Sequence, residues 1–578
     1  MKQMLISMFL VVLLLLSFSL IMTATTRDTI RVWANPVNWP SGTLDDVINS
    51  DTIAGGFVNP NHVFVLQNNA PNDSVFFVIA PITVKGSITV IGKINPVTGK
   101  PPVVAPYIKG DNSSISDYFE PQGNDTLTLK GIYFIGTRAD GAANTGRFVN
   151  PTGDYNVFIF DHCILENITG PQTTPNLFDT WAHAHCSFYI TNCEFRNNQD
   201  DAVGNPGFAW IECASPTDIA CDTAYFRNNT FFFTGGLVLG GGGYAPLKLD
   251  FQHNTIFMST QQGVFQLYYL HNAVIRNNVF YSVGSTSQPL SWGDTMGTGG
   301  WGGNAWFSGL ISLDTLKDVL KSGPLGLTEA GRHVTITNNA YCWPSQITAK
   351  WSTYACQNIP LVTGRGNLLT DKTAWPNINV ASNDSIDPAF DSELVSTSIT
   401  KMLPLIDSAF IAYSADGYRP YVYPMANPGD VVTWGAVPSN WASTKGYPVV
   451  ENLRYTNTAL QTAGTDGKAL GDLNWFPEQL TGVSQSPESI PLQFTLHQNY
   501  PNPFNPSTKI SYTLSVKGMA RLSVYDILGK EVTVLFNEVQ NAGQHEITFN
   551  AEHLSSGVYF CKLMSSGFVM TQKMILMK

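Results

Sequence analysis

The side chains that could do chemistry recur at fixed places in a set of similar segments, and the first group combines arginine, carboxylate, amide and aromatic residues. They stand two and four residues before a turn residue: Tyr189, Tyr225, Arg227, Asp250, Gln252 and Arg276. Aromatic rings offer stacking faces to sugars, and arginine holds a carboxylate in a bidentate fork. Elimination at a uronate needs a base together with a cation that neutralises the sugar carboxylate.

This stripe predicts contact with an acidic polysaccharide. Tyr189, Tyr225 and Gln252 would bind it, and the catalytic candidates are Arg227, Arg276 and Asp250. The alternative is an ordinary solvated sheet face, since exposed polar and apolar residues need no special explanation.

A second group lies in other strands of the same repeats. Alternation along 177–185, 207–212 and 263–271 would expose Asp179, Trp181 and His183, then Trp210 and Glu212, then Gln266 and Tyr268. Trp181, Trp210 and Tyr268 are expected to contact sugar. Asp200 and Asp201 form an adjacent pair that could serve as acid and base, and Ca²⁺ could bind Asp179, Asp200, Asp201 and Glu212.

These residues are positioned by strands that run into one recurring turn. The segments read FIFDHCIL at 158–165, FYITNCEF at 188–195, AYFRNNTF at 224–231, LDFQHNTI at 249–256, AVIRNNVF at 273–280 and VTITNNAY at 334–341. The sixth residue, the ladder position, is Cys163, Cys193, Asn229, Asn254, Asn278 or Asn339. The residues three before it and two after it are always apolar, so an inward face runs up to the turn and resumes after it.

Such a unit cannot bury its own apolar face and must stack on the next, which predicts a solenoid of β-coils. An asparagine amide can donate to and accept from an identical amide one coil away, at the ~4.8 Å strand spacing. Asn278 should therefore be critical to stability, and the preceding Asn277 should matter much less. Cys163 and Cys193, on consecutive coils, are close enough for a disulfide or for stacked free thiols.

Other segments bound the repeats. Residues 43–51 are expected to form a short helix that covers the open end of the first coil. A first degenerate rung is predicted at 126–134, with Gly131 at its turn, and a last one at 362–369. The region 401–480 lacks the repeat and is expected to cap the coils as a C-terminal flank.

The repeated phrase resembles the rungs of right-handed parallel β-helices of the pectate-lyase kind, which implies an all-β architecture for residues 27–400. Asp161 and His162 match an Asp-His pair of pectate lyases, and Asp200 and Asp201 resemble the paired acids of polygalacturonases. The arginine motif of the lyases and the His-Gly and Arg-Ile-Lys motifs of the polygalacturonases are not found in the chain. The resemblance therefore concerns the fold more than the chemistry.

A polar linker at 481–489 leads to a module at 490–578, which reads as a small β-sandwich. It closely resembles the C-terminal sorting domain of the type IX secretion system. The resemblance rests on NYPNPFNP at 499–506, Tyr525-Asp526 with Gly529, Gly557-Val558-Tyr559 and a basic tail. It implies a Gram-negative exporter, contact with the type IX machinery, and attachment to the outer cell surface or release from it.

Composition limits the other partners. Only 13% of residues are charged, while 49 are Gly and 33 are Phe, which favours β structure with tight turns. The net charge of −11 argues against nucleic acid or an anionic membrane as the main partner. Residues 1–24 read as a secretory signal, with an uncleaved anchor as the alternative, and no membrane span is expected in the mature chain.

These observations predict a secreted, surface-attached β-helix protein that contacts polysaccharide and is exported by the type IX system. One alternative is a polysaccharide lyase or glycoside hydrolase that acts on acidic polysaccharide. Another is an adhesin-like structural surface protein.

Overall fold

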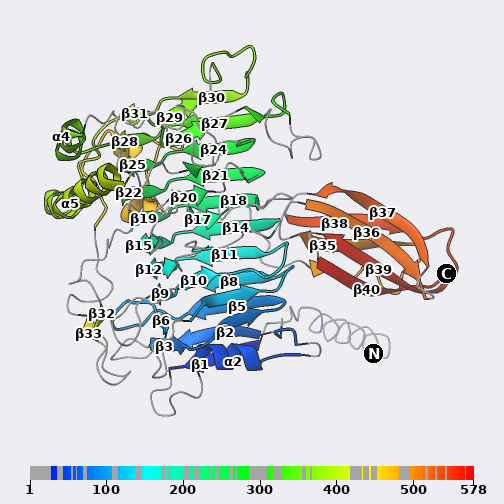
Figure 1. Ribbon diagram of the computed structural model, residues 1–578. Coiled ribbons are helices and arrows are strands. Elements are labelled where there is room, and N and C mark those ends of the chain that lie inside the picture. The colour runs from blue at the N-terminus through cyan, green and yellow to red at the C-terminus, as the bar shows by residue number, and fades with distance from the viewer. Residues whose placement is uncertain are drawn as a thin grey trace, which may run out of the picture.

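The computed structural model consists of stacked β-coils followed by an antiparallel sandwich (Figure 1). It describes residues 28–34, 43–53, 56–59, 62–68, 75–106, 115–136, 146–170, 177–178, 183, 185–196, 198–200, 209–212, 221–234, 237–240, 246–259, 265–266, 270–285, 309–313, 315–316, 328–354, 360–364, 367–416, 432–433, 442–443, 452–480, 495–496, 498–514, 518–527, 530–540, 543–565 and 568–578. The predicted signal peptide and the predicted linker lie outside these residues.

The coils stack into three parallel sheets, and most coils add one described strand to each of them. The first sheet contains β1 (Asp28–Trp33), β2 (His62–Gln67), β5 (Ser87–Gly92), β8 (Thr126–Lys130), β11 (Val157–Asp161), β14 (Cys186–Thr191), β18 (Cys221–Arg227), β21 (Lys248–Gln252), β24 (Asn272–Arg276), β27 (His333–Thr337) and β30 (Ile378–Ala381). The second contains β3 (Val75–Val78), β6 (Val103–Pro106), β9 (Tyr133–Ile135), β12 (Ile164–Glu166), β15 (Glu194–Arg196), β19 (Thr230–Thr234), β22 (Thr255–Ser259), β25 (Val279–Tyr281), β28 (Ala340–Cys342) and β31 (Asp384–Ser385).

The third sheet is described in two parts. One part contains β4 (Ile82–Val84), β7 (Asp117–Pro121) and β10 (Arg147–Val149), and the other contains β17 (Ala209–Glu212), β20 (Leu237–Gly240), β23 (Phe265–Gln266), β26 (Ile311–Leu313) and β29 (Val362–Gly364). A separate pair is formed by β13 (Thr169–Gly170) and β16 (Gln199–Asp200). Sequential strands of each sheet pair in parallel, so the predicted parallel β-helix is confirmed.

The ladder lies in the turn between the first and second sheets. The Nδ2 of Asn254 donates to Oδ1 of Asn278 at 3.2 Å, and the Nδ2 of Asn278 donates to Oδ1 of Asn339 at 2.8 Å. Each Oδ1 also accepts the backbone N–H of the preceding ladder residue, and each Nδ2 donates to a backbone carbonyl, as Asn278 does to Phe251 at 3.0 Å. Both hydrogen-bonding ends of the amide are thus satisfied in the core. The predicted register is confirmed.

The residue before each ladder position takes the left-handed conformation, with φ between 53° and 60° at His162, Asn192, Asn228, His253, Asn277 and Asn338. Gly131 does the same at the predicted first rung. Cys163 and Cys193 are free thiols, with the N–H of Cys163 3.4 Å from Sγ of Cys193. The last rung predicted at 362–369 is wrong, because Val362–Gly364 is β29 of the third sheet, and the last rung lies instead at 378–385, which the sequence analysis did not predict. It places Asn383 at the end of the ladder, where it accepts from Nδ2 of Asn339 at 2.8 Å.

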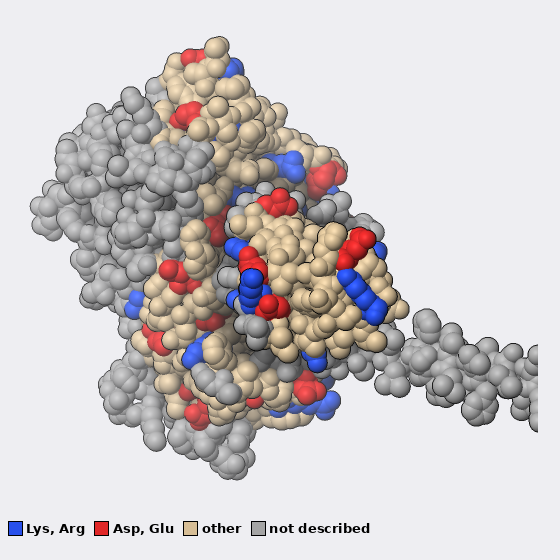
Figure 2. All heavy atoms as spheres, turned by 90° about the vertical axis from the view of Figure 1, so that its right-hand side faces the viewer, with Lys and Arg blue, Asp and Glu red and all other residues tan. Residues whose placement is uncertain are grey.

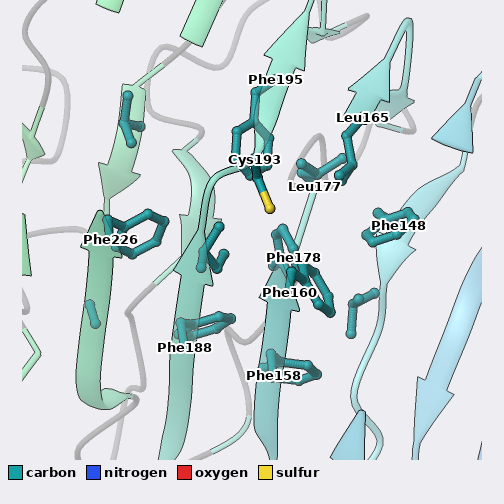
Figure 3. Packing of buried hydrophobic residues seen from close by; sticks show 14 of the residues in the cluster. Phe148, Phe158, Phe160, Leu165, Leu177, Phe178, Phe188, Cys193, Phe195 and Phe226 are labelled. Atoms are coloured by element: carbon teal, nitrogen blue, oxygen red, sulfur yellow. The ribbon is translucent and has the colours of Figure 1, made fainter. Parts of the chain in front are cut away.

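Aromatic and aliphatic side chains fill the space inside the coils (Figure 3). The residues three before the ladder are all fully buried: Phe160, Ile190, Phe226, Phe251, Ile275 and Ile336. Rings stack with the coils, as Phe195 does on Phe231 at 4.8 Å between centroids and 6° between planes. The coil spacing therefore also sets the side-chain spacing of the core.

Helices cover one end and one face. The predicted helix at 43–51 is α2 (Leu44–Ser50), and its Leu44 and Ile48 join the main core. Further along, α4 (Ser345–Thr353) and α5 (Ser392–Asp416) pack against the outer face of the second sheet, as Figure 1 shows at β22, β25 and β28. Trp351, Met402 and Ile406 lie in this second cluster with Phe257 and Tyr281, which explains why the outer face of these strands is apolar.

Residues 452–480, the C-terminal strap, run back along the turn stack, whereas the sequence predicts that this region caps the end of the coils. The strap contacts turns from Asn338 to Asn228: Ala463 O accepts from Nδ2 of Asn338 at 3.3 Å, and Nδ2 of Asn474 donates to Asn228 O at 3.0 Å. It includes the 3-10 turns η4 (Leu460–Thr462), η5 (Leu473–Trp475) and η6 (Pro477–Gln479). At Gly471, φ is 79° and a Cβ would lie 2.5 Å from Oγ1 of Thr255, so only glycine fits this approach.

The strap also changes the expectation for Asn277. Its Nδ2 lies 3.1 Å from both Nε2 of His253 and Oγ1 of Thr465, and its Oδ1 accepts from the N–H of Thr465 at 3.0 Å. Asn277 is 1% exposed. The sequence analysis predicts that substitution of Asn277 has only a mild effect on stability, which would require a turn open to solvent. Because the strap covers this turn, a larger effect is expected.

The remaining described strands lie in the C-terminal region. A short antiparallel pair is formed by β32 (Val432–Thr433) and β33 (Ala442–Ser443). The sandwich has one sheet of β34 (Thr495–Leu496), β35 (Ser507–Leu514) and β38 (Gly543–Asn550), and one of β36 (Gly518–Asp526), β37 (Glu531–Gln540), β39 (Gly557–Ser565) and β40 (Phe568–Leu576). Its core is a separate cluster, which includes Leu496, Phe504, Leu522 and Leu576.

We predict that Asn278→Leu lowers the free energy of unfolding by roughly 1–3 kcal/mol, because the amides of Asn254 and Asn339 would lose buried partners. Asn277→Gly should also destabilise, since glycine keeps the backbone conformation and removes the contacts to the strap. Denaturant unfolding measures both, with the exposed Lys248→Gln as control. An Asn278→Leu variant as stable as the control would contradict the ladder.

A second prediction concerns Asp472 in the strap, whose Oδ2 accepts from Oγ1 of Thr230 at 2.7 Å. Burial raises the pKa of Asp472 from 3.8 to about 8, so the folded state keeps a proton that the unfolded chain releases. The stability of the wild type should therefore fall as pH rises from about 4 to about 8.

Asp472→Asn removes this titration. The variant should gain stability relative to the wild type across that pH range, as measured by urea unfolding at successive pH values. The exposed Asp28→Asn serves as control. A constant difference between Asp472→Asn and the wild type at all pH values would show that Asp472 is ionised in the folded protein.

Candidate functional site

The predicted stripe exists as a continuous row of paired residues on the first sheet. Lys130, Asp161, Thr191, Arg227, Gln252 and Arg276 are successive Cα partners on β8, β11, β14, β18, β21 and β24, and we call them the charged row. All stand two residues before the ladder position, where alternation directs side chains outward. Lys130 was not among the predicted site residues, although TLTLKG places it at the equivalent position of the first rung.

The polar groups of the row bind one another and Asp250, which stands two residues before Gln252 on β21. Nε and Nη2 of Arg227 donate to the two carboxylate oxygens of Asp250 at 3.1 and 2.8 Å. Nε2 of Gln252 donates to Oδ1 of Asp250 at 2.8 Å, and Nε of Arg276 donates to Oε1 of Gln252 at 2.7 Å. Asp250 is therefore held as an ion-pair partner. The sequence predicts one shared face for four residues, and the structure places them side by side and shows which of them are hydrogen-bonded: Arg227, Asp250, Gln252 and Arg276.

The two tyrosines of the predicted stripe point outward but are each only 8% exposed. They lie 6.1 Å apart between ring centroids, in a cluster with Val157 and Ile159. The guanidinium of Arg227 covers the ring of Tyr225 at 4.7 Å. Tyr189 and Tyr225 therefore pack within the protein and do not present open faces on which a sugar could stack.

At the lower end of the row, Asp161 and His162 form a hydrogen-bonded pair. Oδ1 of Asp161 lies 2.9 Å from Nδ1 of His162 and also accepts from Nδ2 of Asn192 at 2.9 Å and from Oγ1 of Thr191 at 3.1 Å. Burial pushes the pKa of Asp161 up, but these hydrogen bonds outweigh it and lower the pKa to about 2. The bond to Asp161 raises the pKa of His162, whose side chain is 64% exposed.

The second predicted group lies mostly outside the described residues. Asp179, Trp181, Asp201 and Tyr268 are among the residues that the structure does not describe, and for Asp200, Trp210, Glu212 and Gln266 it describes the backbone alone. In register, Glu212 pairs with Gly240, which pairs with Gln266. The neighbouring row through Ile211, Leu239 and Phe265 includes the buried Leu239 and Phe265, so positions 210, 212 and 266 alternate with an inward row.

His183 is the member of this group whose side chain is described, and its Nδ1 lies 3.6 Å from Oδ1 of Asp154. Among the described residues, no group of three or more His, Cys, Asp or Glu side chains is arranged to hold a metal ion. The predicted Ca²⁺ site therefore stays a prediction, because its four carboxylates are not described as side chains. The same holds for the acid–base role of Asp200 and Asp201.

Charge is sparse on the described surface. Figure 2 shows a few Lys, Arg, Asp and Glu side chains interspersed among uncharged ones on the face that includes the sandwich. On a chain of net charge −11, the charged row is therefore a local feature, with three cations against Asp161 and the paired Asp250. No described helix is long and apolar enough to cross a membrane.

In the sandwich, the NYPNPFNP segment is fastened to the last strand. Oδ1 of Asn502 accepts from the N–H of Ile575 at 2.8 Å, and the N–H of Phe504 donates to Ile575 O at 2.9 Å. Nδ2 of Asn499, which is 2% exposed, donates to Oγ1 of Thr508 at 2.9 Å. The motif therefore ties both ends of the module together, and Tyr500 stays 77% exposed beside it.

Comparison with known proteins identifies this module. A family profile described as Secretion system C-terminal sorting domain matches residues 498–577. No curated protein and no solved structure matches the chain at a significant level. The match indicates that the chain is secreted by the type IX system, in agreement with the motifs read from the sequence.

Removal of residues 490–578 should leave folded coils that are not exported. The hydrophobic clusters described in the coils include no residue of the sandwich, and the sandwich cluster includes none of the coils, so the coil core does not need the module. Fractionation and protease accessibility of intact cells measure the outcome against the full-length chain. Equal surface display of the truncated protein would contradict the assignment of the export signal.

Proposed function

We propose that this exported protein holds an acidic polysaccharide along the charged row without cleaving it. The observation that carries the proposal is the row itself, in which Lys130, Arg227 and Arg276 occupy one line of paired positions across successive coils. Arg227 and Arg276 are two coils apart, or roughly 10 Å at the strand spacing. The coils set the distances between the cations at three strand spacings from Lys130 to Arg227 and two from Arg227 to Arg276, so several charges of one extended acidic polymer could be met along the row.

Arg276 is the residue best prepared to bind a sugar carboxylate. Its Nε is used by Gln252, which fixes the plane of the guanidinium and leaves the two terminal nitrogens as donors. Within the described part of the chain, no hydrogen bond to those two nitrogens is found, and the residue is half-buried. A guanidinium already held in place loses little conformational freedom when it binds.

Arg227 is less available, because its Nε and Nη2 are committed to Asp250. The same pairing favours binding over elimination in this part of the row. Both carboxylate oxygens of Asp250 accept hydrogen bonds from Arg227, and Oδ1 also accepts from Gln252, so neither oxygen is without a donor inside the protein. Asp250 is therefore an orienting residue for Arg227.

A second candidate function, elimination or hydrolysis of an acidic polysaccharide, is favoured by one specific observation. His162 has its Nδ1 held by Asp161, which leaves Nε2 as the outward nitrogen, and Lys130 is the Cα partner of Asp161. An oriented imidazole beside a cation could move the proton at C5 of a uronate while the cation neutralises its carboxylate. Catalysis predicts that a cleaved polysaccharide product forms, whereas binding alone predicts no product.

Retention on immobilised acidic polysaccharide tests the proposal. Arg276→Gln should weaken binding by about tenfold, equivalent to ~1.4 kcal/mol, and Lys130→Gln should weaken it too. Retention of the wild type should decrease as salt is raised. Lys248→Gln, at the exposed far end of β21 in the same sheet, is the charge-matched control and should bind as the wild type does.

Product analysis on the same samples separates the two functions. No shortened or unsaturated chains should form with wild-type protein if it only binds. Products that vanish in His162→Ala would replace binding by catalysis as the function. Wild-type protein that is not retained on any acidic polymer would refute the charged row as a binding site.

A further inference from the structure

The line of paired positions that forms the charged row continues beyond Lys130 to the N-terminal end of the coils. Lys130 is the Cα partner of Ile91, and the same line then passes through Val65 to Arg31. The strands that carry these residues, β8, β5, β2 and β1, lie together at the N-terminal end of the stack (Figure 1). Arg31 and Arg227 are therefore each three strand spacings from Lys130, or about 14 Å, on opposite sides of it.

The cations of the N-terminal coils are exposed and available. Within the described part of the chain, no hydrogen bond or ion pair to the guanidinium of Arg31 is found. The ammonium of Lys93, the residue that follows β5, is likewise exposed and without a partner among the described residues. Further along the stack, Arg227 is bound to Asp250, and Nε of Arg276 is bound to Gln252. A ligand would therefore meet fewer competing contacts at the N-terminal coils.

An exposed tryptophan stands beside Arg31 on the same strand. Trp33 is two residues further along β1, about 7 Å away at the rise of a strand, and the Val32 between them is buried. Trp33 is 51% exposed, and no ring contact or hydrogen bond of its indole is found among the described residues. The ring is thus open to solvent next to an unpaired guanidinium, unlike Tyr189 and Tyr225.

The outward face of these coils carries no carboxylate. The outward positions of β1, β2, β5 and β8, together with the residue after β5, include Arg31, Lys93 and Lys130 but no Asp or Glu. On the later coils, Asp161 and Asp250 stand on the same face and offset the cations there. On a chain of net charge −11, the positive charge of this face is therefore concentrated at its N-terminal end.

We propose that the N-terminal coils form a second subsite for an acidic polysaccharide, in which a sugar ring stacks on Trp33 while Arg31 and Lys93 bind carboxylates. This inference rests on the proposed function, because the ligand is the one that lies along the charged row. An indole offers a stacking face to a pyranose, and a guanidinium about 7 Å away can reach the carboxylate of the stacked sugar or of its neighbour.

The subsite also defines the length of the ligand. From Arg276 to Arg31 the line crosses nine strands, that is eight strand spacings, or roughly 38 Å. Between Arg31 and Lys130 it passes the half-buried side chains of Val65 and Ile91, which a sugar can cover without losing a polar contact. A linear arrangement of cations suits a long linear polyanion better than a flat membrane surface.

Calorimetric titration of the purified full chain with two oligogalacturonates tests the proposal, one long enough to span the nine strands and one of three sugars. The wild type should bind the long chain at least about tenfold more tightly than the short one, and Arg31→Gln and Trp33→Ala should each weaken binding of the long chain by about tenfold. Arg31→Gln should also reduce the salt dependence of binding, whereas Trp33→Ala should keep it, because salt screens charges and not ring stacking.

The matched controls are Lys248→Gln, which removes an exposed cation at the far end of β21, and Tyr500→Ala, which removes an aromatic side chain that is 77% exposed on the sandwich. Both should bind the long chain as the wild type does. Thermal unfolding should show that Arg31→Gln and Trp33→Ala are folded, since both side chains are exposed.

The subsite is overturned if either Arg31→Gln or Trp33→Ala binds the long chain as the wild type does. It is also overturned if the wild type binds phosphatidylglycerol vesicles but neither oligogalacturonate. Arg276→Gln separates this inference from the proposed function. Weaker binding in Arg276→Gln alone would keep the charged row and remove the subsite, whereas weaker binding in Arg31→Gln and Trp33→Ala alone would keep the subsite and remove Arg276 from the binding site.

Discussion

The rest of the structure depends on the backbone hydrogen bonds that stack each coil on the next at the ~4.8 Å strand spacing. These bonds place each residue next to the residue at the same position of the following coil. A residue type that recurs at one position therefore forms a continuous row along the stack. In the turn this produces the asparagine ladder, whose buried amides satisfy one another from Asn229 to Asn383. In the core it stacks Phe195 on Phe231, and at the surface it aligns Arg227 with Gln252 and Arg276.

The same constraint explains how much the sequence could predict. The fold, the register and the ladder could be predicted because six similar segments repeat along the chain. The inward residues predicted from Phe160 to Ile336 are all buried in the structure. The last rung escaped notice because Ser385 stands where the other copies have an apolar residue. The strap could not be predicted, because it joins Asn474 to Asn228, 246 residues away, without any periodicity.

For the candidate site, the sequence predicts which residues share a face of the sheet but not which of them bind one another. It placed Arg227, Asp250 and Arg276 on one face, and the structure adds that Arg227 is bound to Asp250 and that Nε of Arg276 is bound to Gln252. Burial of Tyr189 and Tyr225 is likewise a property of packing that alternation alone does not reveal. The export module was predictable because the NYPNPFNP residues are contiguous in sequence, whereas their attachment to the last strand, 73 residues away, appears only in the structure. The sandwich therefore carries the export signal, and the coils carry rows of polar side chains on their surface.

Hydrogen–deuterium exchange of the full chain with and without an oligogalacturonate tests the central claim most directly, because it locates the ligand and reports on backbone protection coil by coil. The account predicts added protection at the ends of β8, β11, β18, β21 and β24 and at the turns that follow them, with the oligogalacturonate recovered at its original length. Protection confined to the third sheet, or recovery of shortened chains, would contradict it.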